Sequence, residues 1–162
     1  MINLEEKKEE IIETATFWFR TLMDLSNDIR KDVKDRTGIS VYIREPGKRN
    51  SLHFSIGEPS TDAQDFAVEK AVRSYVLGHV SSQNSEDPEK LQFAGSLTLE
   101  IDGTIIQVSV SGLQAFEDVF MAIQILSRIS GTYTYSVCLR IAEEGGELPK
   151  FNHWYENQLL QS

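Results

Sequence analysis

The stretch Phe93–Gly131, which decides the fold, reads FAGSLTLEIDGTIIQVSVSGLQAFEDVFMAIQILSRISG. Two alternating apolar runs, Leu97–Ile101 and Thr104–Val110, flank an Asp102-Gly103 step, and a tight primed turn needs residues that tolerate positive φ. A Ser111-Gly112 break then lets the chain leave the sheet sharply. The stretch therefore predicts a β-hairpin followed directly by an α-helix.

Hydrophobic periodicity predicts the remaining elements. They are a helix over about 4–36 that Gly38 ends, strands over about 39–44 and 51–56 joined by a turn at 46–50, a helix over about 62–77 with a Thr61–Gln64 capping box and a Gly78 stop, a surface loop over 81–90, a fifth strand over 132–141 and a terminal helix over 151–160. The sum is one domain over 1–162, an α/β sandwich of the α+β type with about five mostly antiparallel strands.

Length, composition and charge limit the function classes. The chain has 162 residues, 40% of them apolar, and no run approaches the ~20 apolar residues that a membrane span needs, so no membrane partner is expected. A net charge of −9, from 25 acidic and 16 basic residues, argues against nucleic-acid binding. The single cysteine, Cys138, cannot form an internal disulfide, and the N-terminus has no signal-peptide pattern. A cytoplasmic location is therefore expected.

Three short segments carry a resemblance to a known family. They are FAVEKA at 66–71, GHVSS at 78–82 and the hairpin with its Ser-Gly exit and acidic helix start at 95–118. On these segments the chain resembles the GlcG/HbpS-like, or haem-degrading domain, family, which has a profilin-like fold. The resemblance covers about 4–130 and leaves 131–162 as a C-terminal strand-helix extension.

The resemblance implies a homo-oligomer and a ligand site in the groove between the second helix and the hairpin, with haem or another tetrapyrrole or corrinoid as a possible ligand or substrate. The residues proposed for that site are Lys70, His79, Phe93, Gly95, Ser111, Gly112 and Asp118. Two departures from the family pattern argue against haem or metal ligation by this chain. One branch of the family has His-Gly-Gly where this chain has Phe93-Ala94-Gly95, and Asp-His where this chain has Asp118-Val119, so two imidazoles that could ligate haem or a metal are absent.

Other candidate groups have a functional and a structural reading. His79 could ligate haem iron, but it is better explained as a cap at a helix C-terminus. Glu117 and Asp118 could be an acid/base pair, but adjacent helical positions point about 100° apart, and they suit the positive end of the helix dipole. Cys138 has no histidine near it in sequence to act as a base. No catalytic residue and no metal ligand is assigned.

One face of the predicted sheet is rich in polar side chains. It could host a ligand or a subunit contact, although an ordinary solvated sheet face is the favoured reading. Its members are His53, Ser55, Thr98, Glu100, Gln107 and Cys138.

Two functional hypotheses remain open. The first is a non-catalytic cytoplasmic binding module that forms a homo-oligomer, because the helix before Gly131 is apolar on most sides and the stripe on the first helix is wide. A coiled-coil seam on the first helix is the less favoured alternative to packing on the domain's own sheet. The second hypothesis is tetrapyrrole or other small-ligand chemistry, drawing on Lys70 and His79. The tail at 132–162 is expected to pack on the domain.

Overall fold

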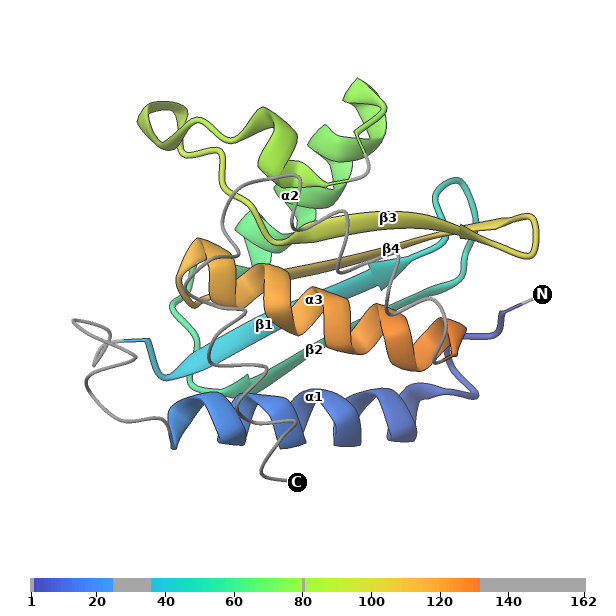
Figure 1. Cartoon of the computed structure of the whole chain (residues 1–162), viewed down its shortest axis with the longest axis horizontal. Helices are drawn as coiled ribbons and strands as arrows, with labels where there is room; N and C mark the ends of the chain where they lie inside the picture. Colours follow the sequence, from blue (N-terminus) through green and yellow to red (C-terminus); the bar gives the residue numbers. More distant parts are fainter. Residues whose placement is uncertain (1, 25–35, 80, 132–162) are drawn as a thin grey trace.

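The structure, a computed structural model, describes residues 2–24, 36–79 and 81–131. Its elements are α1 (Lys8–Met23), β1 (Gly38–Arg44), β2 (Ser51–Gly57), α2 (Ala63–Leu77), two short 3₁₀ helices η1 (Ser82–Ser85) and η2 (Pro88–Lys90), β3 (Ser96–Ile101), β4 (Thr104–Ser111) and α3 (Ala115–Ser130). The four strands form one antiparallel sheet in the order β2-β1-β4-β3. Helices α1 and α3 cover one face, and α2 covers the other (Figure 1).

This arrangement confirms a mixed α+β class and the antiparallel pairing. The sheet has four strands within the described ranges. The predicted fifth strand, the terminal helix and the packing of the tail all fall at 132–162, outside the described residues, as does Cys138. A specifically profilin-like topology therefore stays a prediction.

Both predicted hairpin turns, at 46–50 and at Asp102-Gly103, are confirmed. In the first, the Glu45 N–H donates to the Asn50 carbonyl at 2.9 Å. In the second, Asp102 and Gly103 have φ values of 49° and 83°, so both central residues adopt the positive φ that a primed turn requires, and Ile101 pairs with Thr104 across it. The Ser111-Gly112 exit is confirmed too. Gly112 has φ 130°, and a Cβ there would collide with the carbonyl oxygen of Gly38, so the chain can turn into α3 only with glycine.

The main core lies between the sheet and the pair α1 and α3. Alternate strand residues supply it, and they are Ile39, Val41, Ile43, Leu52, Leu97, Ile106, Val108 and Val110. Helix α3 is buried on nearly its whole circumference from Val119 to Leu126, and the edge of the Trp18 ring meets Phe120 at 5.4 Å between ring centroids. The prediction that more than the sheet covers this helix is confirmed. Because its apolar surface is buried within one chain, α3 gives no reason to expect a second copy.

The first helix differs from its prediction. It is regular over Lys8–Met23, after a turn that starts at Leu4, and residues 25–35 lie outside the described residues. Gly38 does not end a helix; it is the first residue of β1 and pairs with Gly57. A Cβ at Gly38 would collide with the backbone of Glu58 and Pro59, which explains why a glycine stands there.

One prediction for helix α2 is wrong and one is confirmed. Its N-cap is Asp62 without a side-chain cap, so the Thr61–Gln64 capping box is wrong, whereas Gly78 ends the helix in the left-handed conformation as predicted. The helix also turns its small residues to the sheet and leaves Val72 and Val76 exposed. The reason is the polar strand face beneath it, where Gln107 Nε2 donates to the Ala71 carbonyl at 2.9 Å and Ser109 donates to that of Ala67.

The polar sheet face is thus only partly solvated. Gln107 is fully buried under α2, contrary to the solvated reading, while His53, Ser55 and Glu100 remain exposed. His53 lies within 3.1 Å of Ser40 Oγ through Nε2 and 3.4 Å from Gln64 through Nδ1. Partial burial lowers its pKa from 6.5. None of the members of this face that the structure describes lines the cavity described below.

The segment 81–90, predicted as a surface loop, is built into the fold. It forms η1 and η2, and Ser81 and Ser82 are buried. Arg73 of α2 holds it: Nε donates to Ser85 Oγ at 2.8 Å, and Nη2 donates to the carbonyls of Ser82 and Phe93. A buried guanidinium with these acceptors fixes the segment against α2.

Candidate functional site

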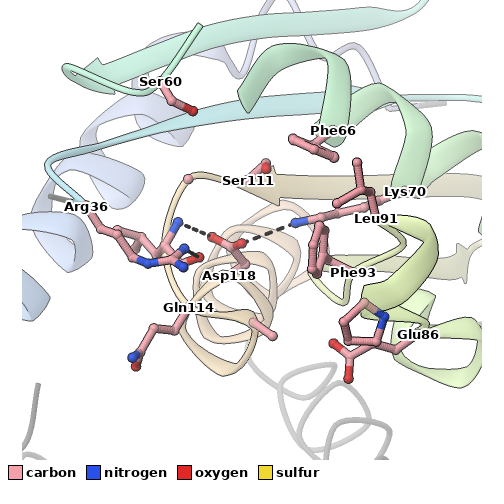
Figure 2. Close-up of a pocket in the computed structure, with 14 residues that line it drawn as sticks. Arg36, Ser60, Phe66, Lys70, Glu86, Leu91, Phe93, Ser111, Gln114 and Asp118 are labelled. Carbon is pink, nitrogen blue, oxygen red and sulfur yellow. Dashed lines mark hydrogen bonds and ion pairs between the residues drawn. The ribbon is translucent and has the colours of Figure 1, made fainter. Parts of the chain in front are cut away.

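A cavity of about 640 Å³ opens between α2, the segment 86–93 and the start of α3 (Figure 2). This volume lies within the range typical of small-molecule sites. Its lining residues are Arg36, Ser60, Phe66, Lys70, Glu86, Pro88, Leu91, Phe93, Ser111, Gly112, Leu113, Gln114, Ala115 and Asp118.

The structure brings most of the predicted site residues to this cavity. Lys70, Phe93, Ser111, Gly112 and Asp118 all line it. They come from α2, the segment before β3, the end of β4 and the first turn of α3, so only the tertiary fold makes them neighbours.

Gly95 lies directly behind the cavity floor. It has φ 129°, and a Cβ there would come within 2.8 Å of Lys70 Nζ and of Asp118 Cβ. The glycine therefore leaves room for these two side chains to meet, a role in packing that the sequence did not indicate.

His79 is not among the lining residues. It follows α2 directly, and its backbone N–H donates to the Ser74 carbonyl at 2.9 Å, within the helix C-terminal cap. Its Nδ1 is buried and has no hydrogen-bond partner among the described residues. The structure therefore does not bring His79 to the cavity that Lys70 lines, because His79 lies beyond Gly78, which ends α2.

An ion pair between Lys70 and Asp118 forms the cavity floor. The two side chains, both almost completely buried, meet at 3.2 Å between Nζ and Oδ2. Lys70 also donates to the Val110 carbonyl at 2.7 Å, and Asp118 Oδ1 accepts the Leu113 N–H at 3.1 Å. The pair thus ties α2, β4 and α3 together at the point where the chain leaves the sheet.

Burial dominates the electrostatics of this pair. Loss of solvation lowers the pKa of Lys70, and the nearby Asp118 carboxylate offsets part of that effect. Loss of solvation also raises the pKa of Asp118 from 3.8 to about 7, against the opposing influence of Lys70 and of the Leu113 N–H. The carboxyl group therefore titrates near neutral pH as part of a coupled pair.

Glu117 and Asp118 have different roles. Glu117 forms a reciprocal capping box with the N-cap residue Gln114, whose N–H donates to Glu117 Oε1 at 3.2 Å. Asp118 is the partner of Lys70. The dipole-based reading thus describes Glu117 well and misses the ion pair that Asp118 forms with Lys70.

One wall of the cavity is apolar. The Phe66 and Phe93 rings meet edge to face at 5.6 Å between centroids. Leu91 is 60% exposed and has φ 57°, a left-handed conformation that is unusual for a leucine. Figure 2 shows these three side chains together, across the cavity from Arg36 and Gln114.

Arg36 stands on the opposite wall. Its Nη1 donates to the Leu113 carbonyl, which holds the guanidinium beside the entry to α3. Sequence reasoning missed it, together with Phe66, Leu91 and Leu113. An arginine in a run of alternating basic and acidic residues (31–36, KDVKDR) carries no sequence signal for a site, and the apolar residues look like ordinary core positions.

The cavity does not suit haem. Its described lining contains no histidine, cysteine, methionine or tyrosine that could supply an axial ligand. Lys70, the one amine, already donates to Asp118 and to Val110. Among the residues that the structure describes, no group of three His, Cys, Asp or Glu side chains is placed to hold a metal ion.

Comparisons with protein-family models, with curated proteins and with solved structures found no match. The class that the fold and the cavity define is therefore an α+β domain with a candidate small-molecule site. Membership of the GlcG/HbpS-like family remains a prediction from the resembling segments. None of the helices in the described ranges is long and apolar enough to cross a membrane.

Proposed function

We propose that this domain is a cytoplasmic, non-catalytic module that binds a small molecule in the cavity between α2, the segment 86–93 and α3. The proposal rests on one observation: side chains fixed by the fold form the floor and the walls of the cavity. A buried ion pair forms its floor, and a segment held by Arg73 forms one wall. Leu91 and the Phe66–Phe93 pair present apolar surface to its interior, where a ligand would gain from burying it.

We infer a non-catalytic role because the charged groups at the floor bind each other and the protein backbone. Lys70 donates to two acceptors, and each carboxylate oxygen of Asp118 accepts a bond from a protein group. In this arrangement the pair supports the wall of a binding site.

A fragment screen followed by ¹H–¹⁵N correlation spectra tests the proposal. Binding in the cavity should shift the amide signals of Ser111–Ala115 and Leu91–Phe93. Ala115→Phe, which places a ring in the cavity, should abolish these shifts, whereas the exposed Val76→Phe on α2 should not. Hits that bind Ala115→Phe as well as the wild type would refute the site.

Tetrapyrrole binding is the alternative that the family resemblance implies, and the described lining argues against it. A haemin titration decides between the two. We expect no one-to-one Soret shift that depends on His79. A stoichiometric shift lost in His79→Ala would overturn this expectation and locate a haem site away from the cavity.

A homo-oligomer is a separate proposal. It is supported by the exposed apolar residues of α2 and no longer by those of α3, which are buried. Four apolar side chains of α2 are exposed next to one another along its last two turns, and they are Val72, Tyr75, Val76 and Leu77. An exposed cluster of this kind is typical of an interaction surface. Light scattering should show an oligomer that Val76→Asp dissociates; a monomer of 18.4 kDa at micromolar concentration would contradict the proposal.

A further inference from the structure

We propose that the ligand is a monocarboxylate with an apolar body, its carboxylate bound by Arg36 and its body held against Phe66, Leu91 and Phe93. This inference rests on the proposed function, because it assigns a ligand class to the same cavity. It follows from how charge and apolar surface are divided between the two walls.

The cationic groups of the cavity differ in what remains free. Lys70 is paired with Asp118 at 3.2 Å. Arg36 uses Nη1 for the Leu113 carbonyl, and no carboxylate in the described part of the chain lies within salt-bridge distance of it. Toward the described residues, its Nε and Nη2 therefore remain available. A guanidinium held on one edge presents its other donors as a planar fork, the geometry that matches a carboxylate.

The surroundings favour a single negative charge. Asp118 and Glu86 also line the cavity, and the chain as a whole carries −9, so a dianion would meet repulsion. Two N–H groups at the start of α3 are also taken: those of Leu113 and Gln114 donate to the side chains of Asp118 and Glu117. A phosphate, which usually needs several such donors, would find few here.

The opposite wall sets the rest of the ligand. Phe66 and Phe93 form an edge-to-face pair, and Leu91 keeps 60% of its surface exposed beside them. A positive-φ leucine costs backbone energy that a polar surface loop would avoid with glycine or asparagine. An apolar ligand body that covers Leu91 gives this side chain a function. Because Arg36 and these apolar side chains line the same cavity, one molecule with a carboxylate and an apolar body can contact both walls.

The test uses matched probes on the whole chain. One set consists of phenylalkanoates and C6–C10 alkanoates, and the others are the primary amides and the phosphate monoesters with the same apolar bodies. Dissociation constants come from amide shifts on titration into the wild type and Arg36→Gln. The surface variant Arg49→Gln is the control, because Arg49 is exposed in the β1–β2 turn. Arg36→Gln removes the guanidinium and its charge and leaves a polar side chain in its place.

We expect the carboxylates to shift cavity signals and to bind at least tenfold more tightly than the amides and the phosphates. Arg36→Gln should remove that preference, and Arg49→Gln should leave it intact. Amides that bind in the cavity as tightly as carboxylates would overturn the ligand class and leave the binding function standing. Phosphate monoesters that bind most tightly would overturn it as well. If no probe of any set shifts a cavity signal, the ligand class is refuted, and the independent fragment screen decides the binding function.

Discussion

At the scale of single residues, the pairing of Lys70 with Asp118 is the feature on which the site depends. The two lie 48 positions apart, and sequence reasoning placed both in one site only through the family resemblance. Their ion pair and their burial could not be predicted, since the sequence gives no distance between α2 and α3. Local patterns did better at turns, where Asp102 and Gly103 determine the backbone directly.

A double-mutant cycle tests the pair. Lys70→Met and Asp118→Asn should each lower the free energy of unfolding by about 3–5 kcal/mol, because each leaves one buried charged group without its partner. The double variant should lose much less than the sum of the two, since no uncompensated charge remains. Urea unfolding measures all three. Additive losses would show that the two residues act independently.

The same pair predicts a pH dependence. The pKa of Asp118 is raised to about 7 in the folded chain, so between about pH 4 and pH 7 the folded state binds more protons than the unfolded state. Stability contributed by the protonated carboxyl is therefore present below pH 4 and is lost as the pH rises through 7. Relative to Lys70→Met/Asp118→Asn, the wild type should lose stability across this range. A constant difference from pH 4 to pH 7 would contradict the raised pKa.

Gly95 offers a test of the packing behind the floor. Gly95→Ala should destabilise by about 2 kcal/mol or more, because the new Cβ would lie 2.5 Å from the Val110 carbonyl oxygen and 2.8 Å from Lys70 Nζ and Asp118 Cβ, and the residue has positive φ. Gly103→Ala is the matched control, since its φ is 83° and nothing lies within 4 Å of its Cβ position. It should cost about 1 kcal/mol from backbone strain alone. Equal losses in thermal or urea unfolding would show that the space at Gly95 is not needed.

At the scale of elements, alternation and periodicity predicted the hairpin of β3 and β4, the strands β1 and β2 and helix α3, within a few residues. They failed on α2. The predicted capping box is absent, and no local pattern indicated the hydrogen bonds that the polar strand face below donates to the backbone carbonyls of this helix. They also failed on the segment 81–90, because the buried contacts of Arg73 join residues that no local pattern links.

Arg73 tests whether this segment positions the cavity wall. Arg73→Met loses the hydrogen bonds to Ser85 and to the Phe93 carbonyl, so amide hydrogen exchange over 82–93 should become faster. The affinity of the cavity for any ligand should fall by about tenfold. Arg128→Met is the control. That side chain is half-exposed, and its nearest carboxylate, on Glu10, is 3.8 Å away. Unchanged exchange in Arg73→Met would show that the segment is held by other contacts.

At the scale of the whole molecule, the cavity lies where the chain passes from the sheet to α3, beside α2. The sheet stops at Ser111, α3 starts four residues later under it, and α2 lies over both with the segment 86–93 beside it (Figures 1 and 2). Sequence reasoning found five of the 14 lining residues, and the nine that it missed include Arg36, Phe66 and Leu91. These come from distant parts of the chain and acquire a common role only when the layers assemble.

Crystals soaked with the tightest-binding fragment from the screen would show whether a ligand binds in this cavity. We predict difference density between Arg36 and Phe93, above the Lys70–Asp118 pair, with Leu91 covered by the ligand. The same soak of Ala115→Phe crystals should show none. Density only at another surface, or equal density in both crystals, would contradict the claim.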